Sequence, residues 1–268
     1  MTNLGERPTV SNVLVQNVSK VFVSTRGEPV QALRHISFDV KPHEFFSIVG
    51  HSGCGKTTLL NLIAGFERPS EGWIVVGGQE VLGPSRERGV VFQEHALFPW
   101  YTVHQNISFG LEMKGLTRQE RERLVRYDID LVGLTGFERK YPRELSGGMK
   151  QRAGIARSLA PDPRILLMDE PFASLDYQNR ILMQDELLRI WGRETKTVVF
   201  VTHNIEEAVK LSDRVLVLTC RPGGVREVVS VGLPRPRDEA DSEFVRLKVQ
   251  ITRELQEELA QEQRRGVS

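Results

Sequence analysis

Cysteine is scarce in this sequence: Cys54 and Cys220 are the only two among 268 residues. Two cysteines cannot build a disulfide framework, so the composition favours a reducing, cytosolic setting. His51 and Cys54 stand three positions apart, but neither joins a further pair at zinc-ligand spacing. A protein-held transition metal is therefore not expected.

Long apolar runs and an excess of charge of one sign are also missing. No apolar run approaches the roughly 18 residues that a membrane-spanning helix requires. The polar stretch MTNLGERPTVSN lacks the apolar region of a signal peptide. The 36 Lys and Arg against 35 Asp and Glu leave a net charge of +1, which gives no reason to expect nucleic acid as a partner.

Segments rich in β-branched apolar residues recur along the chain, and their pattern changes from beginning to end. FFSIVG, ILLMDE and TVVFVTH are almost continuously apolar, which is typical of strands in a parallel sheet covered on both faces. The earlier strands alternate more and indicate an antiparallel subsheet. We therefore predict an α/β fold, at a length that permits one large core or two small domains.

The region between Gln93 and Ile165 has helical patterning, which predicts a helical insertion into this core. The segment TRQERERLVRYDIDLVGL opens with Thr117 and Glu120 at capping-box spacing. After Gly232, LPRPRD cannot continue a central strand. A charged helix is predicted to follow, with one apolar face formed by Phe244, Leu247, Ile251, Leu255 and Leu259.

The segment GHSGCGKT fits the phosphate-loop pattern G-x-x-x-x-G-K-[ST]. It follows the predicted strand FFSIVG and precedes the helical TTLLNLIAG, which is the context that this pattern requires. Gly50, Gly53 and Gly55 would let the backbone wrap phosphates with its N–H groups pointing inward. Lys56 would reach the β- and γ-phosphates, and the Thr57 hydroxyl would bind Mg²⁺. The sequence therefore predicts a nucleoside triphosphate site.

Carboxylates and a histidine follow two of the later strands. Asp169 is suited to holding Mg²⁺ through water, and Glu170 to polarising an attacking water. An acidic pair after a strand is by itself more often a helix cap or a solvated turn, but a phosphate loop in the same chain favours the catalytic interpretation. His203 ends TVVFVTH and is a candidate for contact with the γ-phosphate; taken alone it would be a surface or capping histidine.

A second anion cradle is predicted at ELSGGMKQRAGIARSLA, where paired glycines precede a long helical run. The unsatisfied N–H groups and the dipole at a helix N-terminus favour negative charge. The alternative, a capped helix whose glycines merely pack closely, explains SGG alone but not its place between Gln93 and Asp169.

The motifs occur in the order found in one family. Over about residues 11–230 the chain resembles the nucleotide-binding subunits of ATP-binding cassette (ABC) transporters. GHSGCGKTT is similar to the Walker A loop, LSGGM to the LSGGQ signature, ILLMDE to the Walker B strand and SLD to the D-loop. Phe22 resembles the aromatic residue that stacks on adenine, Gln93 the Q-loop glutamine, and His203 the switch histidine.

The resemblance implies a P-loop NTPase core of the RecA-like type, with an antiparallel β subsheet and an inserted α-helical subdomain. It implies that residues 1–268 form a single nucleotide-binding domain. The core is expected at about 11–96 and 160–230, the helical subdomain at about 97–159, and the tail helix at about 238–264.

The resemblance also assigns residues to ATP and Mg²⁺. It implies that the chain is an ATPase with catalytic roles for Lys56, Glu170 and His203, and that Thr57, Gln93 and Asp169 bind the metal. The residues expected to contact the nucleotide are Phe22, Gly50, His51, Ser52, Gly53, Cys54, Gly55, Lys56, Thr57, Thr58, Gln93, Ser146, Gly147 and Gly148.

The resemblance gives the second cradle a purpose. In this family two subunits meet head to tail, and the signature helix of one caps the γ-phosphate held by the Walker A loop of the other. A two-fold homodimer would make two such sites from one chain. Met149 replaces the signature glutamine but leaves Ser146, Gly147 and Gly148 intact, so we expect a working site.

LFPWYTVHQNISFGLEMKG, LSGGMKQRAGIARSLA and LPRPRD resemble importer ATPases for nitrate, taurine and aliphatic sulfonates. Such subunits work at the cytoplasmic face of the bacterial inner membrane, with a membrane permease and, indirectly, an external solute-binding protein. We expect the segment from Gln93 to Asn106 to dock the permease, with Phe98 and Trp100 as exposed anchors; their burial in the helical insertion is the alternative.

Two other functions and one redox role fit the sequence less well. A non-transport ABC ATPase of chromosome maintenance or translation is disfavoured, because the chain has one cassette and no sustained heptads. Retention of Lys56, Asp169, Glu170 and His203 disfavours an inactive nucleotide-binding regulator. Cys54 is interpreted as a small residue that fits the loop rather than as a redox sensor, although a helix N-terminus can lower a thiol pKa.

Overall fold

A computed structural model describes residues 12–93, 96–194 and 196–266. At its centre is a six-stranded sheet of order β10-β9-β3-β8-β7-β6, parallel except for the antiparallel edge strand β10. The strands are β3 (Phe45–Val49), β6 (Arg88–Val91), β7 (Ile165–Asp169), β8 (Thr197–Thr202), β9 (Arg214–Leu218) and β10 (Val225–Ser230). The expected parallel sheet is confirmed.

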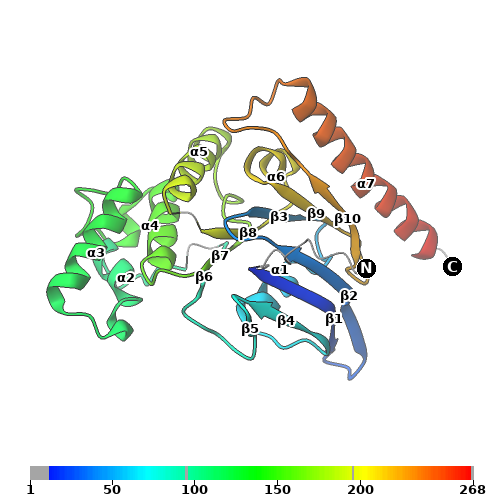
Figure 1. The fold of residues 1–268 in the computed structure, drawn as a ribbon, viewed down its shortest axis with the longest axis horizontal. Helices are drawn as coiled ribbons and strands as arrows, with labels where there is room; N and C mark the ends of the chain where they lie inside the picture. Colours follow the sequence, from blue (N-terminus) through cyan, green and yellow to red (C-terminus); the bar gives the residue numbers. More distant parts are fainter. Residues whose placement is uncertain (1–11, 94–95, 195, 267–268) are drawn as a thin grey trace, which may run out of the picture.

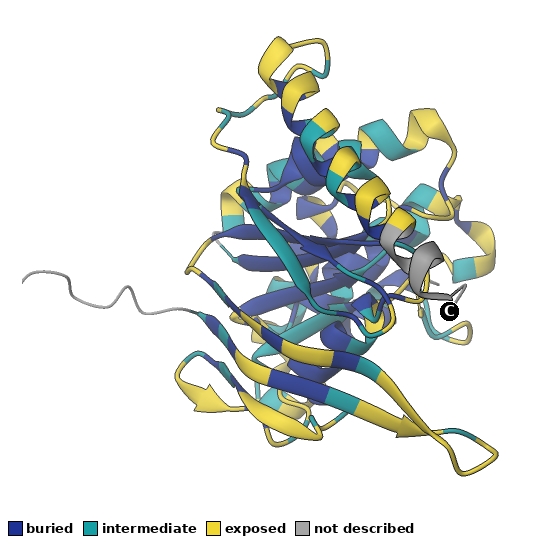
Figure 2. Ribbon diagram, turned by 90° about the vertical axis from the view of Figure 1, so that its right-hand side faces the viewer, coloured by how far each residue is buried: buried dark blue, intermediate teal, exposed yellow. Residues whose placement is uncertain are grey.

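Alternation along the strands divides the interior into two main cores. Leu166 and Phe200 face a core shared with the helical insertion, whereas Leu167 and Val201 face a core shared with the antiparallel sheet. Because successive side chains point to opposite faces, strands between two covered faces must be apolar throughout. Figure 2 shows this as continuous dark blue along the central strands.

A separate four-stranded antiparallel sheet has the order β2-β1-β4-β5. Its strands are β1 (Val13–Val23), β2 (Pro29–Val40), β4 (Glu71–Val76) and β5 (Gln79–Glu80). Helix α1 (Lys56–Ala64) contacts both sheets. The antiparallel subsheet expected from the alternating early segments is thus confirmed.

The chain between β6 and β7 is helical and groups at one end of the molecule (Figure 1). It contains α2 (Val103–Phe109), η1 (Glu112–Lys114), α3 (Arg118–Leu131), η2 (Pro142–Glu144) and α4 (Gly147–Leu159). Thr117 caps α3 as expected: its hydroxyl accepts from the Glu120 N–H at 3.3 Å, and the Glu120 carboxylate accepts from the Thr117 N–H at 2.9 Å. The residue boundaries of the subdomains remain a prediction.

Three helices follow β7: α5 (Tyr177–Glu194), α6 (Ile205–Leu211) and the tail helix α7 (Ser242–Gly266), which begins four residues later than predicted. Phe244, Leu247, Ile251 and Leu255 are buried in a third core with α6, β9 and β10; the side chain of Leu259 lies outside the described residues. Within the described part of the chain, no helix combines the length and apolarity needed to cross a membrane.

Candidate nucleotide-binding and catalytic site

The phosphate loop lies between β3 and α1, as its sequence predicts. Gly53 and Gly55 have φ angles of 80° and 92°, a region that side chains with a Cβ rarely adopt. At Gly50 a Cβ would lie 2.4 Å from the Cys54 sulfur. Glycine is therefore required at these three positions by conformation or by space.

Lys56 is buried at the start of α1, and its side chain bends across the loop. Its ammonium group donates to the carbonyl oxygens of Gly50 at 2.8 Å and His51 at 3.0 Å. It also lies 3.9 Å from Glu170 Oε1. The loop therefore wraps around the ammonium group that the sequence predicts to bind phosphate.

Thr57 and Asp169 supply the oxygen atoms that a magnesium ion prefers. The Thr57 hydroxyl donates to Asp169 Oδ1 at 3.2 Å. Burial raises the pKa of Asp169, as does the neighbouring charge of Glu170, whereas the Thr57 hydrogen bond and the Lys56 charge oppose the rise. A bound cation would stabilise the ionised form of Asp169, which burial and the Glu170 charge disfavour. Among the described residues no group of three or more His, Cys, Asp or Glu could hold a metal, but Mg²⁺ commonly takes only one or two protein ligands, so the pair fits it.

Glu170 is held in an unusual backbone conformation, with φ at 44° in the left-handed region. Its N–H donates to the Val201 carbonyl at 2.9 Å, which ties it to β8. Its carboxylate Oε2 lies 2.8 Å from Nδ1 of His203, whose side chain is largely exposed. Strained backbone in a non-glycine residue concentrates at functional sites.

The structure thus brings Lys56, Thr57, Asp169, Glu170 and His203 together. Contacts between described residues do not join Phe22 or Gln93 to this cluster. Phe22 is partly exposed near the end of β1, where the Lys20 ammonium lies 4.8 Å from its ring centre. Gln93 is exposed after β6.

Ser146 caps the signature helix α4, and its hydroxyl accepts from the Met149 N–H at 3.3 Å. Gly147 lies beside the SLD turn, because a Cβ at Gly147 would be 3.5 Å from Leu175 Cδ2. The signature segment is therefore adjacent to the turn that follows β7 in the same subunit.

Two residues of the phosphate loop make contacts with distant parts of the chain that no sequence pattern indicated. His51 Nε2 lies 3.1 Å from the backbone carbonyl of Leu255 on α7. Cys54 is fully buried, the Cys220 side chain forms a hydrogen bond with its thiol, and burial raises the pKa of Cys54. Since the thiolate is the reactive form, this environment supports the packing interpretation and not the redox sensor.

A mostly apolar groove of about 580 Å³ lies between β6 and the helical insertion. Trp100, in the loop beside it, is 66% exposed, whereas Phe98 is half-buried and its ring centre lies 4.7 Å from that of Phe109. Trp100 is therefore exposed as expected and Phe98 only partly so; their role as anchors remains a prediction. The apolar and cationic lining includes Phe92, Phe98, Phe109, Met113, Arg86 and Arg157.

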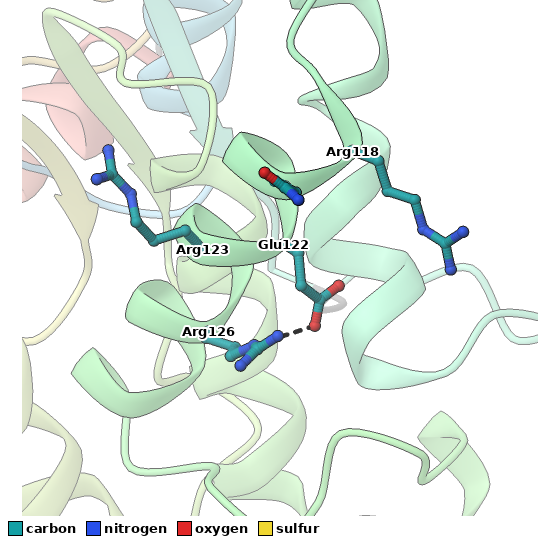
Figure 3. Close-up of a pocket in the computed structure, with 5 residues that line it drawn as sticks. Arg118, Glu122, Arg123 and Arg126 are labelled. Carbon is teal, nitrogen blue, oxygen red and sulfur yellow. Dashed lines mark hydrogen bonds and ion pairs between the residues drawn. The ribbon is translucent and has the colours of Figure 1, made fainter.

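A second, polar hollow of about 740 Å³ lies along α3 and is lined by Arg118, Gln119, Glu122, Arg123 and Arg126. Figure 3 shows these side chains projecting from one helix, with Arg126 directed at Glu122. The Arg126 Nε to Glu122 Oε1 distance is 3.1 Å. These are charges on an exposed helix face and contribute nothing to the phosphate-loop cluster.

A glycine-rich loop at the end of a parallel strand, a buried lysine across it, and an acidic pair ending a neighbouring strand define a P-loop nucleoside triphosphatase. The fold class expected from the sequence is confirmed.

Comparisons with known proteins narrow this class. A family profile described as ABC transporter matches residues 33–173. The chain is 52% identical over 245 residues to an uncharacterized ABC transporter ATP-binding protein of Methanocaldococcus jannaschii, covering 91% of each. It is 47% identical to a nitrate import ATP-binding protein of Synechocystis, covering 87% of this chain and 88% of that one. It is 41% identical to an aliphatic sulfonates import ATP-binding protein of Bacillus cereus, covering 91% and 96%.

A solved structure of an ATP-binding cassette, dimeric and bound to ADP and Pi after hydrolysis, superposes with a TM-score of 0.73 at 30% identity. It covers 83% of this chain and 100% of that one. This chain belongs to the ABC transporter family and is one of its ATP-binding proteins, which are ATPases.

Proposed function

We propose that this chain is the ATP-hydrolysing subunit of an importer for a small solute such as nitrate, taurine or an aliphatic sulfonate. It would work as a homodimer at the cytoplasmic face of a bacterial inner membrane, held there by a permease. A solute-binding protein outside the membrane would act on it only through that permease. The names of the nitrate and sulfonate import relatives support the transport class.

The observation that carries the proposal is the joint placement of Lys56, Thr57, Asp169, Glu170 and His203 at one edge of the parallel sheet. Lys56 and the loop N–H groups would bind the phosphates. Glu170 would orient the attacking water and accept its proton, and His203 would fix the Glu170 carboxylate through Nδ1 while its exposed side faces the γ-phosphate.

Thr57 and Asp169 would hold Mg²⁺, with Gln93 as a further ligand from the loop after β6. When bound, the ion neutralises the charge of the β- and γ-phosphates. The residues of the chain would position the nucleotide and the attacking water.

Ser146, Gly147 and Gly148 are proposed to bind the ATP held by the partner subunit. Ser146 and Gly147 are exposed and Gly148 is half-buried at the N-terminus of α4, a position that suits an anion brought by another molecule. A neighbouring cassette structure is dimeric with ADP and Pi bound, which supports this arrangement.

The groove beside Trp100 is proposed to receive the permease. An exposed tryptophan next to an apolar hollow with an arginine rim is typical of an interface anchor. No residue of this subunit would touch the solute, so its identity depends on the permease and the binding protein.

The test is to co-purify the subunit with its permease, reconstitute the complex in vesicles, and measure ATP hydrolysis together with uptake of nitrate, taurine and alkanesulfonates. We expect solute-dependent uptake that requires ATP and is lost in the Lys56→Ala complex. An intact complex that hydrolyses ATP but moves none of these solutes would reject the solute class, and one without hydrolysis would reject the catalytic assignment.

A further inference from the structure

Glu207, in the first turn of α6, is a buried carboxylate only four residues after His203. It is 4% exposed. The Thr202 hydroxyl donates to its Oε2 at 2.6 Å, and the Gln184 side chain on α5 forms a second hydrogen bond with it. Burial raises the pKa of Glu207, and these hydrogen bonds together with the Arg180 charge oppose the rise.

Arg180 joins Glu207 to the SLD turn. Its Nε lies 3.6 Å from Glu207 Oε1, and its Nη2 donates to the Leu175 carbonyl at 3.0 Å. Leu175 is the middle residue of that turn, and its side chain packs against the signature helix at Gly147. One guanidinium group therefore touches the turn on one side and the start of α6 on the other.

The same network fixes the backbone on both sides of His203. Thr202 immediately precedes the histidine, and its hydroxyl donates to Glu207 while accepting from the Asn204 N–H at 3.0 Å. Asn204 in turn caps α6, accepting from the N–H groups of Glu206 and Glu207. A shift of Glu207 would thus be transmitted to the histidine through its two chain neighbours.

We propose that Arg180 and Glu207 are positioning residues that link the SLD turn, and through Leu175 the signature helix, to His203. The inference rests on the proposed function, in which the signature serves the partner's ATP and His203 serves the subunit's own. The Arg180–Glu207 pair then connects the two ATP sites of the dimer through one subunit.

The distance between Arg180 and Glu207 permits a second, closer arrangement of these two side chains. Arg180 Nε is buried and has no hydrogen-bond partner, and 3.6 Å is longer than an N–H···O bond of about 2.9 Å. A movement of the turn that carries Arg180 toward Glu207 would complete this bond. A buried ion pair contributes little net stability compared with apolar residues of the same volume, so stability alone does not account for it.

The first test uses Arg180→Met, Glu207→Gln and the double variant, each in the full chain assembled with its permease. We expect each single substitution to lower kcat roughly 10- to 100-fold, because misplacement of a catalytic group by about 1 Å has effects of this size. KM for ATP should change less than about two-fold, since the phosphate loop is untouched. Arg180→Met leaves Glu207 without a cation, so a drop in stability is also expected for this variant.

The double variant separates positioning from stability. With both charges removed, resistance to urea should return toward that of the wild type, whereas kcat should stay low. Recovery of kcat together with stability would show a purely structural pair and overturn the inference. Arg226→Met is the matched control: its Nε pairs with Glu254 at 2.8 Å between β10 and α7, and we expect unchanged kcat.

The second test asks whether Glu207 acts through His203. In a His203→Ala background, Glu207→Gln should cause little further loss of kcat, because residues acting in one path are not additive. Additive losses would overturn the inference. Glu170→Gln tests the proposed function separately: near-normal hydrolysis there rejects the role of Glu170, whereas wild-type kcat in every Arg180 and Glu207 variant rejects only the coupling.

Discussion

Nδ1 of His203 lies 2.8 Å from Oε2 of Glu170, and this contact joins the ends of the neighbouring parallel strands β8 and β7. The Glu170 N–H also donates to the carbonyl of Val201, which lies in β8 two residues before the histidine. The carboxylate that is proposed to orient water is therefore fixed through both its backbone and its side chain. Such fixation is what a positioned base requires.

The Glu170→Gln variant should almost abolish ATP turnover while still binding ATP. Removal of a positioned base commonly lowers the rate by roughly 10²–10⁴-fold. Phosphate release and binding of labelled ATP measure the two effects, and gel filtration should detect a trapped ATP-bound dimer. Glu87→Gln, which alters an exposed ion pair with Arg164, is the control; near-normal hydrolysis by Glu170→Gln would assign the role to another residue.

Trp100→Ala should weaken binding to the permease and leave the stability and ATPase rate of the isolated subunit unchanged, because this side chain is 66% exposed. Phe98→Ala should weaken permease binding and also lower stability, since Phe98 packs on Tyr101 and Phe109. Co-purification yield and thermal unfolding are the measurements.

Trp73→Ala is the matched control for loss of a surface indole, because Trp73 is an exposed tryptophan on the antiparallel sheet. Equal permease binding by Trp100→Ala and wild type would remove this residue from the interface.

Mixed dimers decide whether the signature acts on the partner's ATP. The Lys56→Ala subunit loses the phosphate-binding cation, and the Gly147→Asp subunit places a carboxylate where phosphate would bind. Each homodimer has two defective sites. A site shared between subunits predicts that a mixed dimer has one site with both defects and one with neither, so ATPase activity returns in part.

Random assembly makes about half of the dimers mixed, so the recovered rate is measurable. A Cβ at Gly147 makes only an ordinary 3.5 Å contact with Leu175, and Gly147→Ala controls for the added bulk. A purified heterodimer with no more activity than either homodimer would contradict the shared site.

Asp128, 7% exposed on α3, makes stability depend on pH. Burial, followed by the negative charges of Glu194 and Asp162, raises its pKa from 3.8 to about 7, with Lys114 opposing. The folded state therefore holds this proton more tightly than the unfolded state, and its contribution to stability is lost as pH rises from about 4 to about 7. At about 1.4 kcal/mol per pH unit the loss is a few kcal/mol.

The Asp128→Asn variant should lack this loss and exceed the wild type in unfolding free energy at pH 8, whereas the exposed Asp130→Asn should match the wild type. Urea unfolding between pH 4 and pH 8 measures the difference. Parallel pH profiles for wild type and Asp128→Asn would contradict the assignment.

Local sequence patterns predicted most of the fold. The near-continuous apolar runs predicted β3, β7 and β8 because a strand covered on both faces has no polar side to show. Strand β10 was not predicted: VREVVS is only half-buried at the sheet edge, and its pattern has little contrast. The short helix α2 was not predicted individually either, although Thr102 and Gln105 at its start form a capping box.

The functional site likewise has a part that the sequence predicted and a part that it did not. Gly50 to Thr57 could be predicted because loop, strand and helix are consecutive in the chain. The Arg180–Glu207 pair and the contact of His51 with Leu255 could not, since each joins residues far apart in sequence through side-chain directions that no local pattern specifies. Single charged residues in helices are compatible with many partners.

The pairing of Asp169 with Val201 in the parallel ladder has a consequence for insertions and deletions. A slip of β7 by one residue would move Glu170 into the place of Asp169 and Asp169 into the place of Met168. Because β7 is apolar on both faces, the strand itself would stay in the sheet. The short connection at Pro163 and Arg164, just before β7, is where such a slip would originate. Loss of one residue there would place a carboxylate at the proposed metal-binding position but Pro171 at the proposed water-orienting position, leaving a folded protein without a group to orient the water.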